Sequence, residues 1–411
     1  MKTLKTINSI LAVLIAAILT ACSSGVTSDA SADLFSIPTD KATVCQLTDI
    51  ATDIEVVPLT HNEPIGILMQ SRVYADKMIL YESTDNNSSL LICNRKGEVL
   101  KRLSRKGRGP GEYQWISDFI YMPENDWLVV YDRNLYKCFI YTLADFKFLK
   151  QIELKQEATE TSMHEEGIRS MCQLSEKELL LSVETQTGYL DEKSGEPVSE
   201  MKYTLSVLNV ESGERRNIEY DEKLGAMGCI TRIGDEIVAV ASQNNNRLHT
   251  LVSISDKGSV EELMQFDYGV MTRPEGMDDK ADGDLMLDEK SGHIYTEYAT
   301  APCFVSYTKK EFTLWFMNGL GFANMPPLML YHRTGGGEVM AKQIKVAGLT
   351  RKFQPIAYDA NNKECWAVVY GPAETWIDKK TEPSPLATEI IEKLNAQSDD
   401  NPVLVKFRLK R

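Results

Sequence analysis

The chain has 411 residues and is acidic, with 45 Lys and Arg side chains against 59 Asp and Glu and a net charge of −14 at pH 7. This balance argues against a nucleic-acid binder, which needs a basic face, and against a basic membrane-surface protein. Hydrophobic residues make up 43 % and charged residues 25 %, values that exclude extensive disorder. The length permits several average domains, but a large all-β fold can also occupy it as one unit.

The first residues have the features of a lipoprotein signal peptide. Two lysines precede the apolar stretch Ile7–Leu19, which is shorter than the roughly 20 apolar residues of a membrane-spanning helix. The stretch ends in Leu19-Thr20-Ala21-Cys22, which looks like a bacterial lipobox whose Cys becomes the lipidated first residue of the mature chain. We therefore predict a signal peptide over residues 1–21 and lipidation of Cys22. The alternative is an ordinary signal peptide with a chance Cys.

A polar segment follows the lipobox. Residues 22–40 are rich in Ser, Ala, Thr and Asp, which predicts a flexible tether before a single domain over residues 41–411. In lipoproteins with this kind of signal, a Ser such as Ser23 after the Cys implies delivery to the outer membrane. Because no acidic cluster of the surface-export kind follows Cys22 directly, we favour the periplasmic side over the cell surface.

The cysteines do not form a recognisable pattern. Of the eight in the chain, seven remain after Cys22, an odd number, and no two form a CxxC pair. This spacing is not typical of a disulfide framework. Cys93 and Cys138 lie inside apolar runs, which predicts small buried hydrophobic side chains.

Two segments of the body resemble each other. Residues 78–103 and 127–152 each contain three apolar runs separated by turns. Matching positions lie 48 to 50 residues apart, namely Tyr81 and Tyr131, Ile92 and Ile140, and Leu103 and Ile152. A period near 50 with several short strands per repeat predicts a β-propeller. The runs are continuously apolar because each blade packs against a neighbour on both faces.

Later repeats are less regular. Leu179–Leu181 is expected to pair with Leu205–Leu208 across an insertion near residues 185–202. Ile237–Val240 is expected to pair with Leu251–Ile254. Both pairs are short apolar runs of the kind seen in the first two repeats.

The last repeats suggest how the fold closes. Ile294–Tyr298 is expected to begin one blade and Phe353–Tyr370 the last blade, which ends with Val403–Leu409. The strand-like Asp53–Leu59 has no partner of its own, so it is expected to complete the last blade and remove an unpaired edge. Residues 300–327 hold strand-like sequence without an assigned place. We predict an all-β chain with six four-stranded antiparallel blades, one insertion and one short helix.

That helix begins at Ser384-Pro385, an N-cap followed by Pro at the first helical position. Leu386, Ile390, Ile391 and Leu394 follow at helical spacing. We expect this apolar stripe to pack against the wall of the propeller. The alternative is a helix that binds a partner or acts as a lid.

One motif between the first two repeats is distinctive. It comprises Arg105, Lys106, Gly107, Arg108, Gly109, Pro110, Gly111, Glu112 and Tyr113. It lacks the pattern of a nucleotide-binding loop. We expect a connector between two blades, with Glu112 accepting hydrogen bonds from backbone amides. The alternative function is contact with an anion or a partner, through exposed amides and three cations.

A family resemblance begins at this motif. Asn94–Leu100, Gly107–Tyr113 and Asp118 together resemble the signature of six-bladed β-propeller lipoproteins of Bacteroidetes, which are NHL-like and largely of unknown function. Asn401-Pro402-Val403-Leu404, the helix before it and the lipobox are also similar to that family. The resemblance covers essentially residues 41–411. It implies six blades and membrane attachment, and it implies no catalytic residues.

Signatures of enzymes are mostly absent. The chain has neither GxSxG nor HExxH. The five histidines are scattered without ligand-like spacing and are His61, His164, His249, His293 and His332. Residues distant in sequence can still meet at the mouth of a propeller, so a metal site of histidines or carboxylates there is an open alternative.

Three further features have structural as well as functional interpretations. The acidic Met277–Asp284 predicts a solvated loop, with a weak Ca²⁺ site as the alternative. Gly335–Gly337 lies between apolar runs and predicts a hairpin turn. Trp127 and Trp366 lie in strand-like runs and are expected in the core, whereas Trp376 is the better candidate for an exposed residue that stacks on a ligand.

Two functions of different classes follow. The favoured one is a membrane-anchored, non-enzymatic binding or scaffold propeller that recognises an envelope protein, peptide or glycan, without a cofactor and without nucleic acid. The alternative is a metal-dependent hydrolase or lyase, with a divalent cation at the propeller axis and the site at the central mouth. It rests on analogy of fold, which is a weak argument for function.

Overall fold

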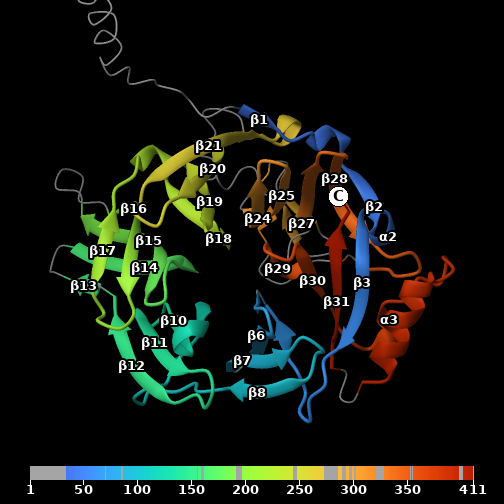
Figure 1. The fold of residues 1–411 in the computed structure, drawn as a ribbon, viewed down its shortest axis with the longest axis horizontal. Helices are drawn as coiled ribbons and strands as arrows, with labels where there is room; N and C mark the ends of the chain where they lie inside the picture. Colours follow the sequence, from blue (N-terminus) through green and yellow to red (C-terminus); the bar gives the residue numbers. More distant parts are fainter. Residues whose placement is uncertain are drawn as a thin grey trace, which may run out of the picture. The chain divides into compact units, whose positions relative to one another are not determined.

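The fold is a six-bladed β-propeller, as predicted (Figure 1). The computed structural model describes residues 34–411 apart from positions 70, 85–86, 155, 159–161, 191–196, 244–247, 273–285, 289–292, 296–298, 300–301, 318, 321–327, 352, 354, 398–400 and 411.

The first three blades follow one another along the chain. Blade 1 comprises β4 (Ile67–Leu68), β5 (Arg72–Val73), β6 (Lys77–Thr84), β7 (Asn87–Asn94) and β8 (Val99–Leu103). Blade 2 comprises β9 (Asp118–Met122), β10 (Trp127–Asp132), β11 (Lys137–Thr142) and β12 (Phe148–Glu153). Blade 3 comprises β13 (Gln156–Ala158), β14 (Ser162–Gln173), β15 (Glu178–Leu190), β16 (Pro197–Asn209) and β17 (Arg215–Ile218).

The other three blades include strands from the N-terminal end of the domain. Blade 4 comprises β18 (Ala226–Ile233), β19 (Glu236–Gln243), β20 (Leu248–Ile254), β21 (Val260–Asp267) and β1 (Leu34–Ser36). Blade 5 comprises β24 (Pro302–Thr308), β25 (Glu311–Met317), β27 (Leu328–Thr334), β28 (Gly337–Lys345) and β2 (Thr43–Gln46). Blade 6 comprises β29 (Pro355–Asp359), β30 (Glu364–Val369), β31 (Val403–Leu409) and β3 (Ala51–Pro58).

The repeat detected in the sequence corresponds to real structural equivalence. Tyr81 and Tyr131 lie in the second strands of blades 1 and 2, and the other matched pairs lie in the third and fourth strands. The pairing of Leu179–Leu181 with Leu205–Leu208 is confirmed, and so is that of β19 with β20. The hairpin turn at Gly335–Gly337 is confirmed as well, since Thr334 pairs with Gly337.

The expected insertion near residues 185–202 is an extension of the blade 3 hairpin, since β15 and β16 continue as one ladder out to Leu190 opposite Pro197. One assignment from the sequence is wrong. Ile294 does not begin a blade. It lies in β23 (His293–Tyr295), which forms a small separate sheet with β22 (Met286–Asp288) and β26 (Gly319–Leu320). The first two strands of blade 5, β24 and β25, instead lie within residues 300–327, the segment to which the sequence assigned no blade.

Six hydrophobic clusters fill the spaces between neighbouring blades. In the cluster between blades 1 and 2, Tyr81 and Leu103 meet Phe119 and Leu128. Equivalent clusters lie between each following pair, including blades 6 and 1, where Leu404 and Trp366 meet Met78 and Leu91. Each blade therefore buries apolar side chains on both faces, which explains the continuous apolar runs. Cys93 and Cys138 belong to these clusters and are fully buried, as predicted.

The ring closes through strands from opposite ends of the domain. β3 pairs antiparallel with β31, from Pro58 opposite Val403 to Ala51 opposite Leu409, which confirms the predicted closure. Upstream of β3, β1 adds in parallel to β21 and β2 adds in parallel to β28. The N-terminal segment thus runs along the outer edges of blades 4 and 5 before it completes blade 6 (Figure 1). The expected tether is therefore too long, because the domain begins by Leu34 rather than at residue 41.

Helix α3 (Pro385–Asn395) packs against blade 6. The Ser384 hydroxyl accepts a hydrogen bond from the Ala387 amide at 3.2 Å, which confirms the predicted N-cap. Ala387, Ile390 and Leu394 are buried in the hydrophobic cluster between blades 5 and 6. The apolar stripe is therefore used within the domain, as the favoured interpretation expected.

Removal of β31 tests the closure. Deletion of Val403–Arg411 takes the central partner from both β30 and β3, and it exposes the clusters on both sides of blade 6. We expect the truncated chain to lose its cooperative thermal transition, measured by circular dichroism. Deletion of Arg411 alone is the control and should leave the melting temperature unchanged. An unchanged melting temperature in the longer truncation would contradict closure by this strand.

Candidate functional site: the connector between blades 1 and 2 and the face with long connections

The two ends of the blades differ in the length of their connections. First strands join second strands, and third strands join fourth strands, through two to five residues in every blade where both are consecutive. At the other end, residues 104–117 join blade 1 to blade 2, residues 346–354 join blade 5 to blade 6, and residues 370–402 join β30 to β31. Binding residues concentrate on such long connections over a rigid scaffold. This end of the propeller is therefore the candidate binding face.

The connector between blades 1 and 2 is held by its own backbone. The Gly107 amide donates to the Tyr113 carbonyl at 2.9 Å, and the Tyr113 amide donates to the Arg105 carbonyl at 3.0 Å. Glu112 turns back over the loop, where its Oε2 accepts from the Gly109 amide at 2.8 Å. The motif therefore connects two blades, and Glu112 bonds the backbone as the structural interpretation expected.

Two glycines are required by this geometry. A Cβ atom at Gly107 would lie 1.9 Å from Oε2 of Glu112. Gly111 has a φ of +73°, and a Cβ there would lie 2.5 Å from the Phe148 ring. The glycines thus allow the carboxylate and the neighbouring blade to approach the backbone closely.

The connector is anchored at its far end by aromatic and acidic side chains. Tyr113 is fully buried, its hydroxyl donates to the Ser88 carbonyl at 2.9 Å, and burial raises its pKa to about 12. The buried Asp132 carboxylate accepts from the amides of Gln114 at 2.6 Å and Trp115 at 3.1 Å. Few conformations are left to the connector once these bonds form.

The side chains that the connector presents outward are basic and aromatic. Arg105, Lys106 and Arg108 are exposed, and Arg105 lies over the Tyr141 ring at 5.8 Å. Trp115 is 37 % exposed. An acidic chain thus carries three exposed cations and an indole on one rigid loop.

Trp115 and Trp376 both lie in long connections between strands, but Trp115 is exposed and Trp376 is buried. Trp376 is 4 % exposed, its indole donates to the Tyr370 carbonyl at 2.7 Å, and it packs against Phe353. The prediction of Trp376 as a stacking residue is therefore wrong. Its polar, Pro-containing surroundings suggested exposure, but segment 371–385 folds down onto blade 6 beside α3. Trp366 is buried, as expected of a core residue, whereas Trp127 is half-buried and packs against the edge of the cluster between blades 2 and 3.

Arg72 connects blades 1, 2 and 3. Its guanidinium donates to Asp118 of blade 2 at 3.0 Å and to the Met171 carbonyl of blade 3 at 3.2 Å. The carboxylate of Asp118 counters the cost of burying this cation and raises its pKa. Asp118, one of the residues of the sequence signature, therefore has a structural partner that sequence spacing alone could not identify.

A second cluster of ion pairs connects blades 2 and 3 around Glu184 of β15. The buried Glu184 accepts from Arg133 at 2.6 Å and from Arg169 at 3.0 Å. Arg133 and Arg169 are both more than one-third exposed, so one carboxylate counters two cations.

The histidines with described side chains do not converge. His249 is fully buried beside the Tyr268 hydroxyl at 2.9 Å, and burial lowers its pKa to about 4. His332 lies between Thr313 and the Lys410 carbonyl, each at 2.9 Å. Across the described part of the chain, no three His, Cys, Asp or Glu residues form a group that could hold a metal ion. The acidic Met277–Asp284 and the side chain of His293 lie outside the described residues.

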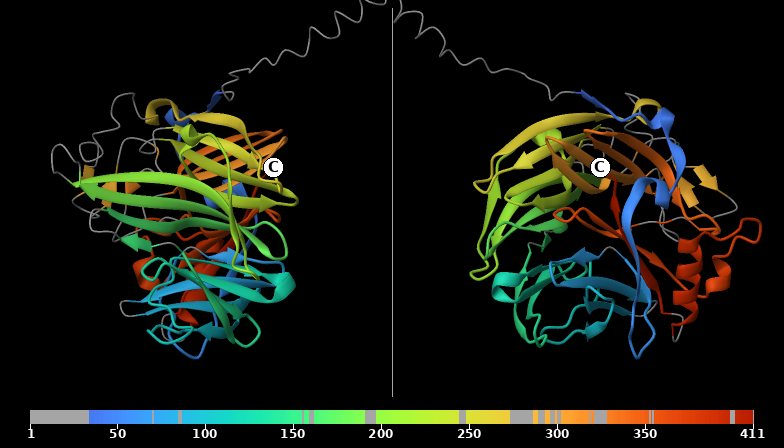
Figure 2. Two further views of the ribbon diagram at one scale, coloured as in Figure 1. Left: turned by 90° about the vertical axis from the view of Figure 1, so that its left-hand side faces the viewer. Right: turned by 45° about the vertical axis from the view of Figure 1, so that its right-hand side comes forward.

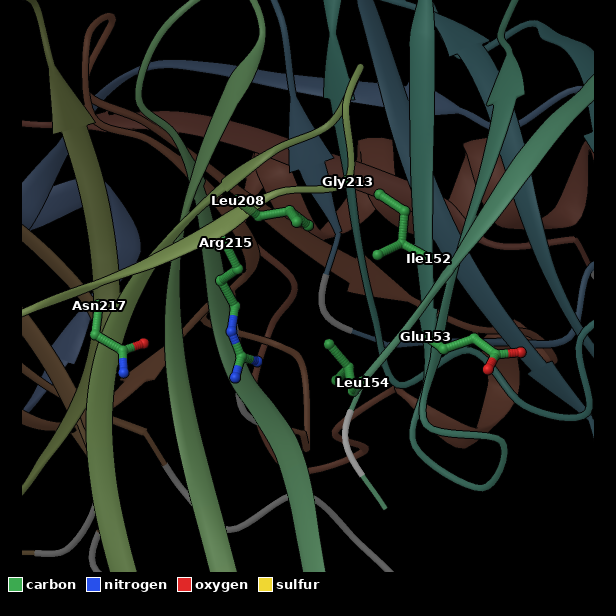
Figure 3. Close-up of a pocket in the computed structure, with 7 residues that line it drawn as sticks. All are labelled: Ile152, Glu153, Leu154, Leu208, Gly213, Arg215 and Asn217. Atoms are coloured by element: carbon green, nitrogen blue, oxygen red, sulfur yellow. The ribbon is translucent and has the colours of Figure 1, made fainter. Parts of the chain in front are cut away.

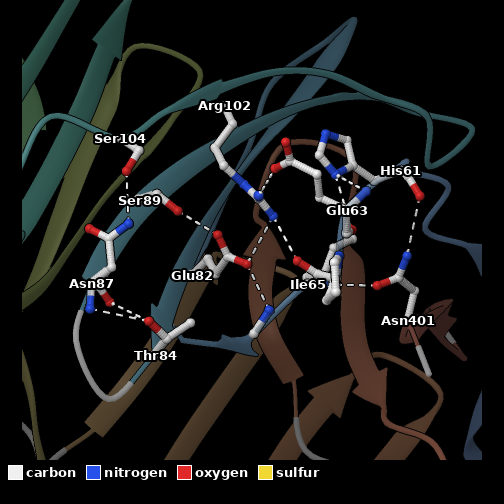
Figure 4. Close-up of polar contacts among 12 residues, drawn as sticks. His61, Glu63, Ile65, Glu82, Thr84, Asn87, Ser89, Arg102, Ser104 and Asn401 are labelled. Carbon is white, nitrogen blue, oxygen red and sulfur yellow. Dashed lines mark hydrogen bonds and ion pairs between the residues drawn. The ribbon is translucent and has the colours of Figure 1, made fainter. Parts of the chain in front are cut away.

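Asn401, the first residue of the C-terminal motif that resembles the propeller lipoproteins, belongs to a polar network (Figure 4). Asn401, 1 % exposed, accepts from the Ile65 amide at 2.8 Å. Glu82, also buried, accepts from the Gly66 amide at 2.7 Å and from Arg102 at 3.2 Å. Together they hold the segment that leads from blade 6 into blade 1, so these buried polar groups are structural.

One pocket of about 370 Å³ lies between the outer strands of blades 2 and 3 (Figure 3). Its lining residues are Ile152, Glu153, Leu154, Leu208, Gly213, Arg215 and Asn217. Arg215 donates two hydrogen bonds to Glu166, at 2.8 and 2.7 Å, and Asn217 accepts from Ser206 at 2.8 Å. Because these polar groups already have partners, the pocket is a weaker candidate than the connector.

Comparison with known proteins assigns the chain to a family. Residues 34–408 match the model of "Domain of unknown function (DUF4934)". The chain belongs to the DUF4934 family. Among proteins with curated descriptions, none matches it. The match begins at the first strand of the described domain and ends in the closing strand, so the family corresponds to the whole propeller.

A solved structure from Bacteroides fragilis shares the fold of this DUF4934 protein. A Bacteroides fragilis protein described as exported is 14 % identical with a TM-score of 0.59, and the match covers 93 % of this chain and 100 % of that chain. A DUF4221 family member from Bacteroides vulgatus is 10 % identical with a TM-score of 0.43, over 88 % of this chain and 98 % of that chain. At a sequence identity this low, the likeness to the Bacteroides fragilis structure shows a common fold and nothing further. No helix in the described residues is long and apolar enough to cross a membrane.

Substitution of Gly107 tests the packing of the connector. We expect Gly107→Ala to lower the free energy of unfolding by about 1–3 kcal/mol, because the new methyl group would overlap the Glu112 carboxylate. Adding Glu112→Ala removes that overlap, so the double variant should be less destabilised than the sum of the single variants. Gly335→Ala, where a Cβ meets no atom within 4 Å, is the matched control. Urea unfolding measures all four variants, and strict additivity would contradict the contact.

Proposed function

We propose that this DUF4934 protein is a non-enzymatic binding propeller of the cell envelope. The observation that carries the proposal is the connector between blades 1 and 2. It is fixed by internal hydrogen bonds, and it presents three exposed cations and Trp115 on an otherwise acidic chain. A surface that is ordered before binding loses little conformational entropy when it meets a partner.

The chemistry of the connector points to an acidic partner. Arginine binds carboxylates through paired hydrogen bonds, and a partly exposed indole adds an apolar contact area. An acidic segment of an envelope protein or peptide, or a glycan that carries carboxylates, offers both kinds of group. The long connections at the same end of the blades would enlarge the contact. The exported neighbour from Bacteroides fragilis supports a place outside the cytoplasm.

The proposal includes a lipid anchor at Cys22, which lies outside the described residues. It rests on the lipobox-like Leu19–Cys22 and on the polar residues that follow. Several acyl chains hold a protein firmly on a membrane. Attachment to the outer membrane, facing the periplasm, remains the favoured location.

Charge reversal tests the connector. We expect Arg105→Glu/Lys106→Glu/Arg108→Glu to reduce capture of envelope components by about tenfold or more, because it replaces attraction to acidic groups by repulsion. The matched control is Lys96→Glu/Lys257→Glu/Lys310→Glu, which makes the same change of charge in exposed short turns. The full chain is immobilised, and the proteins and glycans that it retains from envelope extracts are quantified. Equal losses in both triple variants would count against the connector.

Substitution of Cys22 tests the anchor independently. Cys22→Ser removes the thiol that would carry the lipid, so we expect the protein to move from the membrane fraction to the soluble fraction of the cell. Incorporation of a labelled fatty acid should be lost at the same time. Cys45→Ser, at a partly exposed cysteine within the domain, is the control. A labelled, membrane-bound Cys22→Ser protein would overturn lipidation at this position.

A further inference from the structure

The middle strands of blade 3 are much longer than their counterparts. β14, β15 and β16 have 12, 13 and 13 residues, whereas the middle strands of the other blades have six to nine. The β15–β16 ladder runs without a bulge from Glu178 opposite Asn209 to Leu190 opposite Pro197. These green strands extend past those of the neighbouring blades (Figure 2). We call the described residues of this extended part, 162–166, 184–190 and 197–204, the arm.

The arm has one unpaired edge. β13 covers the other side by pairing with Met163–Glu165, but β17 pairs only with Leu205–Leu208 of β16. In the described residues, Val198–Thr204 therefore pairs with β15 alone. Ser199, Glu200, Met201 and Lys202 are all exposed, although their side chains alternate between two faces of the sheet. Lys202 lies 3.7 Å from Glu222 and Glu200 accepts from the Tyr189 hydroxyl at 2.7 Å, but the backbone of this stretch has no ladder partner on its outer side and can offer its groups to another strand.

The sequence of this edge is complementary to itself. In an antiparallel pair centred on Met201, Glu200 lies opposite Lys202 of the other copy, and Lys202 lies opposite its Glu200. Oppositely charged pairs of this kind stabilise neighbouring strands, whereas like charges destabilise them. Met201, 43 % exposed, would meet its own copy on the opposite face, which also carries Met163 two strands away on β14.

The length of the free edge agrees with this register. With Met201 at the centre, Val198 pairs with Thr204 of the other copy and Thr204 with its Val198. The next pair would be Leu205 with Pro197, and there the edge of β16 is already taken by Ile218 of β17. The unpaired stretch and the self-complementary stretch therefore coincide. We propose that two copies of this protein associate through Val198–Thr204 of β16, in an antiparallel pair centred on Met201.

Cysteine cross-linking tests the register in cells that produce the full chain. We expect Met201→Cys to form a disulfide-linked dimer when copper–phenanthroline is added, because opposite residues of paired strands lie about 5 Å apart between Cβ atoms. Met163→Cys is the matched control. It is equally exposed and lies on the same face, but on β14, away from the edge. Equal cross-linking of both variants, or cross-links of Met201→Cys only to other proteins, would overturn the proposal.

Charge exchange tests the pairing itself. Glu200→Lys alone and Lys202→Glu alone each place like charges opposite one another, so each should weaken self-association by about tenfold or more. The double variant Glu200→Lys/Lys202→Glu restores opposite charges and should associate like the unmodified protein. The two single variants, when mixed, should associate with each other. Sedimentation in detergent measures all of these, and a double variant as weak as the single variants would refute the pairing.

Discussion

Pairing between β3 and β31 is the constraint on which the rest of this structure depends. Each blade buries apolar side chains against two neighbours, so an open row of blades would leave two large apolar faces in water. The ladder from Pro58 opposite Val403 to Ala51 opposite Leu409 joins the two ends of the domain and removes both faces. The buried Asn401 and Glu82 then fix the path from the closing blade into blade 1.

Closure also explains why the connector between blades 1 and 2 can be both tight and exposed. Its inner side fills the space between two blades through Tyr113, while Glu112 and Asp132 satisfy backbone amides. The outer side is left for Arg105, Lys106 and Arg108. A loop built in this way fixes the backbone positions from which its cations project, on a scaffold that cannot open without losing its core.

The sequence predicted those parts of the fold that depend on local pattern. The repeat that matches Tyr81 with Tyr131 identified the blades, and the partnerless Asp53–Leu59 identified the closing strand. The first two strands of blade 5 were not predicted. They lie within residues 300–327, after β22 and β23 of a small separate sheet, and this sheet interrupts the repeat period. The site was less predictable. Trp376 has polar neighbours in sequence yet is covered by tertiary packing, while Arg72 finds Asp118 and the Met171 carbonyl only once three blades meet.

The strands at the N-terminal end of the domain have a mechanical consequence. β1 and β2 contribute three and four residues to the outer edges of blades 4 and 5, and both precede β3 in the chain. A pulling force applied from the N-terminal side would therefore load β1 first and β2 second. These two short ladders can detach in turn and lengthen the chain before any strain reaches the strand that closes the ring. The propeller would thus keep its shape while its attachment yields.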